Sequence, residues 1–195
     1  MDQAIYSMSM NRRYSAYRHI GTAMRQSIVS GLHQRIRGSQ LPDLGLQKYR
    51  KVLFWSVYIL DRQIASKSGY PTSLQSDEIE VELPTDDGLS EAEREDFVSS
   101  EYLTSSIKLA KLTGVTIRHV YSRVKSPTPF MQRVQNVFKQ LTEWFETLPA
   151  PLQLQRESAC NQVAHHVTLL HLAFNQVSLW SELTTFDKAD AIYSV

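Results

Sequence analysis

The stretch RKVLFWSVYILDRQIASKSGYP, from Arg50 to Pro71, constrains the fold more than any other part of the chain. It is apolar from Val52 to Leu60 except at Ser56. On a helix, such a run places apolar side chains around the whole circumference, and a helix of this kind is buried by neighbours on several sides. Gly69 can adopt the left-handed conformation that ends a helix, and Pro71 prevents its continuation. We therefore predict a central, buried helix over residues 47–68.

Helical spacing of apolar residues recurs along the chain, and no alternating strand pattern stands out. We predict further helices over residues 14–30, 90–124, 129–148 and 156–186. Gly31 is expected to end the helix over residues 14–30. A capping box from Ser90 to Glu93 is expected to begin the helix over residues 90–124. Thr128 is expected to cap the helix that starts at Pro129. The fold class predicted is all-α, a multi-helix bundle around the buried central helix. The expected apolar stripes are Tyr17, Ile20, Met24 and Ile28; Phe97, Ile107, Ala110, Ile117 and Tyr121; Phe130, Val134, Val137, Leu141, Phe145 and Leu148; and Val163, Val167, Leu170, Phe174 and Val177.

Length and composition limit the classes of protein that remain. With 195 residues the chain can form one domain with a real core, and we expect a single domain over residues 1–195. A net charge of +1 argues against a nucleic-acid-binding surface along the whole chain. The single cysteine, Cys160, excludes a disulfide framework or a cysteine-based zinc cluster within these residues, and we expect it to be a small, partly buried apolar residue. With no signal-peptide pattern and no run long enough to span a bilayer, we expect a soluble, intracellular protein.

Asp61 and Arg62 are the sharpest polar feature, because they interrupt the apolar helix. Adjacent helical residues point about a hundred degrees apart, so we do not expect the two side chains simply to pair with each other. Either one or both of them reach into a ligand cavity, or each pairs with a neighbouring helix or loop. Since an unpaired buried charge is costly, we favour pairing.

Aromatic and histidine residues offer two further candidate sites. Phe54, Trp55 and Tyr58 could line a pocket for a flat apolar effector, but we favour core packing. His165, His166 and His171 lack the spacing of four that helical zinc ligands prefer, so we predict no metal site. No phosphate-binding glycine loop, nucleophile elbow or HExxH motif is found, and we predict no catalytic and no cofactor-binding residues.

Two charged segments flank these helices. The acidic stretch 72–89, which contains SDEIEVELPTDD, could carry paired catalytic carboxylates, but we favour a solvated loop between helices. The basic stretch NRRYSAYRH, residues 11–19, could contact phosphates, but we favour an exposed helix start.

The order of the motifs resembles the fungal-specific transcription factor domain, the middle region of zinc binuclear cluster (Zn2Cys6) factors. AYRHIGTAMRQSIVSGLH, residues 16–33, is similar to its first conserved segment. The family's most recognisable block corresponds to Arg50-Lys51, Phe54-Trp55, Tyr58, Asp61-Arg62, Gly69 and Pro71. Leu83-Pro84, Trp144 and Leu148-Pro149 match later motifs, and His171 lies in a late helix of the family type. The resemblance covers about residues 15–180.

The resemblance implies a nuclear regulatory domain that modulates transcription by RNA polymerase II, and not an enzyme. It implies a small-molecule effector, and a homodimer or coregulator contact, as partners. DNA would be contacted only through a zinc cluster outside this chain, so we expect no cofactor here, no membrane contact, and a partial or shortened gene product. Two alternatives stay open: a helical dimerisation or scaffold module, and, less favoured, an enzyme acting on a small apolar metabolite.

Overall fold

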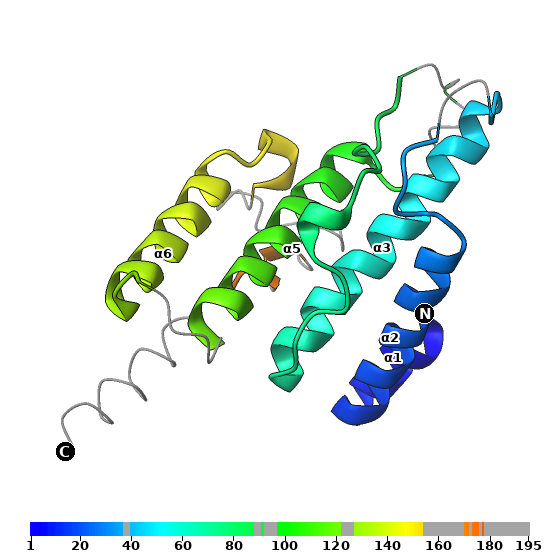
Figure 1. The fold of residues 1–195 in the computed structure, drawn as a ribbon. Helices are drawn as coiled ribbons and strands as arrows, with labels where there is room; N and C mark the ends of the chain where they lie inside the picture. The colour runs from blue at the N-terminus through cyan, green and yellow to red at the C-terminus, as the bar shows by residue number, and fades with distance from the viewer. Residues whose placement is uncertain are drawn as a thin grey trace, which may run out of the picture. The chain divides into compact units, whose positions relative to one another are not determined.

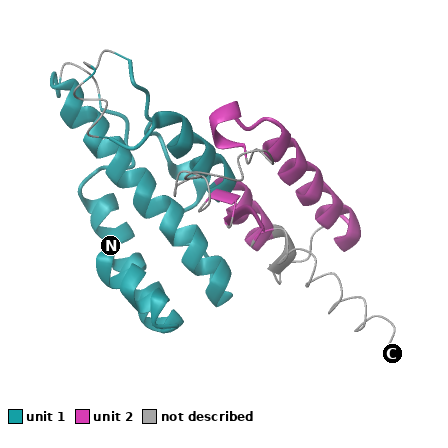
Figure 2. Cartoon of the chain, turned by 180° about the vertical axis from the view of Figure 1, so that it is seen from behind, with its two compact units in different colours: residues 1–110 teal, residues 111–195 magenta. Residues whose placement is uncertain are grey.

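The computed structural model describes residues 1–36, 40–87, 91, 97–121, 127–153, 170–171, 173–175 and 177. Within these ranges the regular structure is helical and no strand occurs, which confirms the all-α prediction. The chain divides into two compact units, residues 1–110 and 111–195, coloured separately in Figure 2. Whether residues 1–195 act as one domain stays a prediction.

The first unit begins with three helices packed in sequence. Helix α1 (Asp2–Ser9) packs on α2 (Arg13–Val29), and α2 packs on α3 (Leu44–Ser68), as Figure 1 shows. Asn11, at a φ of 54°, provides the left-handed residue of the tight turn between α1 and α2, a conformation that asparagine tolerates better than most residues. The sequence pattern did not reveal α1, a short amphipathic helix whose only buried positions are Ala4 and Ser7.

Glycines end both long helices of this unit as predicted. Gly31 has a φ of 65°, and its N–H and that of Leu32 donate to Ile28 and Ser27 at 2.9 Å each. Gly69 has a φ of 69° and ends α3 in the same way. These paired bonds satisfy carbonyls that a helix end otherwise leaves without partners.

Helix α3 is the centre of the first unit. It begins three residues before the predicted start, because the carboxylate of Asp43 accepts the N–H of Leu46 at 3.0 Å and so caps the helix. Half-buried positions remain at Leu53, Ile59 and Leu60, while most of the helix is covered. The buried core around it consists of Ala4, Ala16, Ile20, Met24, Phe54, Trp55, Val57, Tyr58, Ile64, Leu74, Leu103, Ile107 and Ala110. The predicted buried central helix is therefore confirmed.

The predicted uninterrupted helix over residues 90–124 is wrong in its first part. Residues 97–99 are not helical, and α5 runs from Ser100 to Tyr121, across the division between the two units. Phe97 consequently precedes the helix, whereas Ile107 and Ala110 are buried on it as expected. Ser90 and Glu93, the ends of the predicted capping box, lie outside the described residues.

The second unit contains α6 (Phe130–Glu146), which agrees with the predicted helix to within a few residues. Pro129 takes the N-cap position and not the predicted first helical position, a shift of one residue. Val134, Val137, Leu141 and Leu148 of its stripe are buried, but Phe145 is 41% exposed.

The rest of the second unit is described only in part. A short 3-10 turn, η2 (Ala150–Leu152), follows α6. Of the predicted helix over residues 156–186, the described residues, all between 170 and 177, are helical, and Leu170 and Val177 are buried. Val163 and Val167 lie outside the described residues. No helix in the described part of the chain is long and apolar enough to cross a membrane.

Candidate functional site

The charged pair in α3 is fully buried and bound to the chain that follows the helix. Asp61 is 0% and Arg62 1% exposed. Asp61 accepts from the backbone N–H of Ser73 at 3.1 Å and from its hydroxyl at 2.5 Å, while Nη2 of Arg62 donates to the carbonyl of Leu74. The predicted pairing with a neighbouring loop is therefore confirmed, and the ligand-cavity interpretation of these two residues is not supported.

The two side chains also pair with each other, which corrects one prediction. Nη1 of Arg62 lies 2.8 Å from Oδ2 of Asp61. The expectation from helical geometry was wrong because the arginine side chain is long enough to reach the carboxylate of its neighbour, while its guanidinium lies 3.8 Å from the ring centre of Tyr58, four residues earlier on the same helix. A buried cation stacked on an aromatic face and bonded to a carboxylate is largely compensated, although Nε of Arg62 has no partner among the described residues.

The three aromatic residues predicted as core, Phe54, Trp55 and Tyr58, are part of the core, as favoured. Phe54, Trp55 and Tyr58 are at most 1% exposed. The Trp55 ring meets Phe54 and Tyr58 edge-on, with centroids 5.3 and 5.2 Å apart. Nε1 of Trp55 donates to the carbonyl of Glu82 at 3.0 Å, and the Tyr58 hydroxyl lies 2.7 Å from that of Ser76. The polar ends of the two rings thus bind the acidic segment that follows the helix.

That acidic segment, described to residue 87, keeps most of its carboxylates exposed, as favoured, but its apolar residues attach it to the core. Leu74 is buried, and Ile79, Val81 and Leu83 pack against the core from partly buried positions. Glu80 and Val81 donate their N–H groups to the carbonyl of His33 at 3.0 and 2.9 Å. Acidic and apolar residues alternate here, so the apolar residues turn inward while most of the carboxylates stay accessible. Residues 88–89 lie outside the described part.

A second buried charge fixes the far end of this segment. Lys48 on α3 is only 4% exposed, and its Nζ lies against Oδ1 of Asp86 and 4.8 Å from the ring centre of Phe97. Oδ1 of Asp86 also accepts from the hydroxyl of Ser100, the first residue of α5, at 2.7 Å. The segment is therefore bound to α3 near both of its ends.

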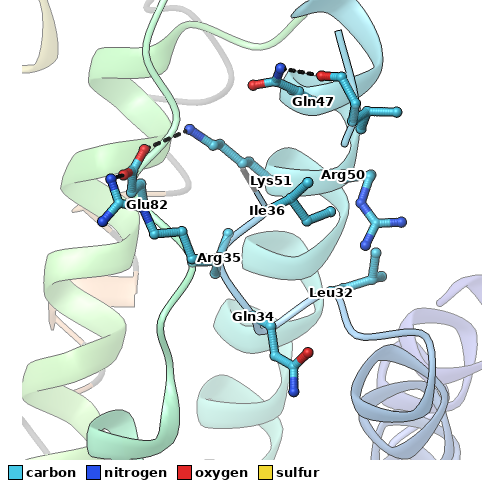
Figure 3. Close-up of a pocket in the computed structure, with 10 residues that line it drawn as sticks. Leu32, Gln34, Arg35, Ile36, Gln47, Arg50, Lys51 and Glu82 are labelled. Carbon is cyan, nitrogen blue, oxygen red and sulfur yellow. Dashed lines mark hydrogen bonds and ion pairs between the residues drawn. The ribbon is translucent and has the colours of Figure 1, made fainter. Parts of the chain in front are cut away.

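A surface pocket of about 50 Å³ lies beside the first turns of α3. Its lining comes from the chain between α2 and α3, from α3 and from the acidic segment. Figure 3 shows Arg35 and Lys51 reaching toward Glu82, and their nitrogen–oxygen distances are 2.9 and 3.3 Å. The full lining is Leu32, Gln34, Arg35, Ile36, Leu41, Gln47, Arg50, Lys51, Val81 and Glu82. Sequence reasoning missed this pocket, because its residues come from three separated segments.

The basic stretch at residues 11–19 forms the exposed start of α2, as favoured. Nη1 of Arg13 reaches the carbonyl of Lys67 at 3.4 Å, and the Tyr17 hydroxyl donates to the carbonyl of Pro71 at 2.8 Å. The pKa of Tyr17 is raised, mainly by burial and to a smaller extent by the nearby charges of Asp61 and Tyr70, while the charge of Arg25 lowers it. Burial also lowers the pKa of Lys67. These contacts attach α2 to the end of α3.

The remaining candidates do not form a site among the described residues. His171 is buried, its Nε2 lies 2.9 Å from the carbonyl of Leu152, and the Phe145 ring meets it edge-on. No group of metal-binding side chains occurs in the described part of the chain. Cys160, His165 and His166 lie outside it.

Comparisons with known proteins add the family. Residues 3–152 match the sequence model of the Fungal specific transcription factor domain. The match includes α1, which lies before the range of about residues 15–180 that the sequence motifs suggested, and it ends before His171. No solved structure matches.

Similar proteins with curated names are transcriptional regulators. An uncharacterized transcriptional regulatory protein of Schizosaccharomyces pombe is 27% identical over 173 residues, 88% of this chain and 22% of that protein. An ABC-transporter-regulating transcription factor of Aspergillus fumigatus is 27% identical over 80% of this chain and 18% of its own length. Activator of stress genes 1 of Saccharomyces cerevisiae is 25% identical over 90% of this chain and 19% of its own length. The chain thus spans about a fifth of the relatives it matches, and it belongs to the fungal-specific transcription factor domain family.

Proposed function

We propose that this chain is a regulatory region of a fungal transcription factor, and that it modulates transcription by RNA polymerase II in the nucleus. The observation that carries the proposal is the family match over residues 3–152, which includes the buried α3 and the segment bound to it. Relatives named as transcriptional regulators or activators support it over a helical scaffold module. The family is one of transcription factor domains and not of enzymes, and we propose no catalytic role.

DNA contact would come from a zinc cluster outside these residues. The sequence holds one cysteine and a net charge of +1, so it supplies neither a Zn2Cys6 ligand set nor a strongly basic chain. A regulatory region without its own DNA reader acts by changing what the attached parts of the factor do. Physically, it needs two arrangements close in free energy, one of which an effector or a partner protein binds better.

The acidic segment between α3 and α5 is the element of the first unit best suited to such a change. Between Gly69 and Asp87 it has no helix except η1 (Ser76–Glu78), and its attachment combines specific polar contacts to α3 with apolar residues that pack against the core. Because the polar contacts are specific, a ligand or a partner that alters them would reposition the segment without unfolding the helices.

A reporter experiment tests the proposal. Residues 1–195 are inserted between an unrelated DNA-binding domain and an activation domain in a fungal cell, and reporter output is measured at matched protein levels. We expect output that differs several-fold from that of a fusion carrying an unrelated helical domain of equal length. Output equal to that of the unrelated domain, across growth conditions, would contradict the proposal.

A further inference from the structure

The pocket beside α3 carries an excess of positive charge. Among its lining residues, Arg35, Arg50 and Lys51 are cationic and Glu82 is the one carboxylate, which leaves two positive charges in excess. Glu82 is shared between Arg35 and Lys51, so neither cation has a carboxylate of its own. An anion placed here would meet cations from the chain between α2 and α3 and from α3 itself.

Arg50 is the cation best placed to receive a ligand. Nη2 of Arg50 donates to the carbonyl of Ser30 at 3.5 Å, a long hydrogen bond, and Arg50 makes no ion pair within the described residues. Figure 3 shows its guanidinium pointing away from the group formed by Glu82, Arg35 and Lys51. A guanidinium with donors still available is suited to bind a carboxylate through two parallel hydrogen bonds.

The rest of the lining sets the size and character of the ligand. Leu32, Ile36, Leu41 and Val81 supply apolar surface next to these charges. A volume of about 50 Å³ holds about four water molecules at roughly 10–15 Å³ each. We propose that this pocket binds a small organic anion, a carboxylate of about four carbons in all with a short apolar body. The regulatory role of the pocket rests on the proposed function, whereas ligand binding is tested by an experiment that does not depend on it.

Glu82 competes with the ligand for Lys51 and Arg35. Its backbone is held in place, because its carbonyl accepts from Trp55 and the preceding Val81 N–H donates to His33. Only the side chain, which is 52% exposed, is therefore able to move aside when an anion enters. The bound carboxylate takes the place of Glu82 on Lys51 and Arg35, so it removes two ion pairs that attach the acidic segment and favours the arrangement in which the segment is repositioned.

Binding is tested by titrating the full chain with butyrate and following backbone amide chemical shifts by NMR. We expect saturable shifts at residues 32–36, 47–51 and 81–82. Butyramide, which has the same shape without the charge, and inorganic phosphate, which has charge without an apolar body, are expected to bind at least several-fold more weakly. If butyramide bound as tightly as butyrate, the assignment of an anion site would be overturned. If phosphate bound as tightly as butyrate, the claim that the ligand needs an apolar body would be overturned.

Three charge variants separate the site from general effects of charge. Arg50→Gln is expected to weaken butyrate binding about two- to fivefold, the effect of one partly exposed ion pair. Glu82→Gln is expected to tighten it, because Lys51 and Arg35 lose their competing carboxylate, and a gain of affinity cannot result from unfolding. Arg18→Gln removes an equal charge from the exposed face of α2, outside the pocket, and is expected to leave binding unchanged.

The proposal is overturned if Arg50→Gln and Arg18→Gln have the same effect, or if Glu82→Gln weakens binding. Absence of butyrate binding together with a positive reporter result would refute the pocket and leave the proposed function standing. Butyrate binding together with a reporter output equal to that of the unrelated domain would keep the pocket and refute the proposed function.

Discussion

Removal of the Asp61 side chain tests how the buried charges of α3 are compensated. In Asp61→Ala, the Arg62 guanidinium keeps the carbonyl of Leu74 and the ring of Tyr58 but loses its carboxylate at 2.8 Å. Ser73 loses its two bonds to Asp61 at the same time. The substitution thus leaves a cation that is 1% exposed without an anionic partner, and it loosens the start of the acidic segment.

The expected cost follows from these contacts. Breaking a buried ion pair by removing one partner typically costs about 3–5 kcal/mol, because the remaining charge stays desolvated. For a chain of this size each kcal/mol lowers the melting temperature by about 2–4 °C, so we expect a decrease on the order of 10 °C. Urea unfolding followed by circular dichroism at 222 nm measures the same loss as a lower midpoint.

A double variant provides the matched control. Replacing both partners, as in Asp61→Leu with Arg62→Met, removes the desolvated charge along with its partner, and such replacements are often close to neutral. We therefore expect the double variant to be more stable than Asp61→Ala alone. A loss below about 1 kcal/mol for Asp61→Ala, or a double variant that is less stable than the single one, would refute the reasoning.

Two further predictions concern glycine substitutions and the stability of the fold at alkaline pH. Gly69→Ala forces a residue with a Cβ into a φ of 69°, and should cost about 1–2 kcal/mol from backbone strain alone, since nothing lies within 4 Å of the added Cβ. Gly21→Ala, inside α2 with contacts of 3.8 and 3.9 Å, should instead stabilise by about 0.5–1 kcal/mol; the same sign for both in urea unfolding would contradict this. The pKa of Tyr17 in the folded state is raised above its ordinary value of 10.0. The stability that the protonated hydroxyl contributes is therefore fully present below pH 10.0 and is lost as the pH rises through the folded pKa. We expect Tyr17→Phe to show a smaller alkaline loss of stability than the wild type, and an identical pH profile would contradict the assignment.

Local signals in the sequence predicted the helices with strong patterns and clear ends. Gly31 and Gly69 ended α2 and α3 where expected, because left-handed caps depend on the residue itself. The start of α3 was missed because it depends on a side-chain bond from Asp43, whose capping role the apolar pattern does not reveal. Helix α1 was missed since its short apolar face becomes visible only against α2.

Contacts between distant segments were the part that sequence reasoning could not supply. The bonds of Asp61 to Ser73 and of Arg62 to the carbonyl of Leu74 join α3 to the segment that follows it, and the helical pattern does not name these partners. The pocket unites the chain between α2 and α3 with α3 itself and Glu82, and no local pattern links these positions. The exposed carboxylates of the acidic segment were expected from its charge, whereas the inward packing of its apolar residues depends on contacts with the core.

Native-state hydrogen exchange tests the central claim, that the acidic segment is bound to α3 as part of the core. The N–H groups of Ser73, Glu80 and Val81 donate to Asp61 and His33 although they lie outside any helix. We predict that these three amides exchange slowly, as the helical amides at the centre of α3 do. Exchange at the rate of an unstructured peptide, while α3 remains protected, would contradict the account.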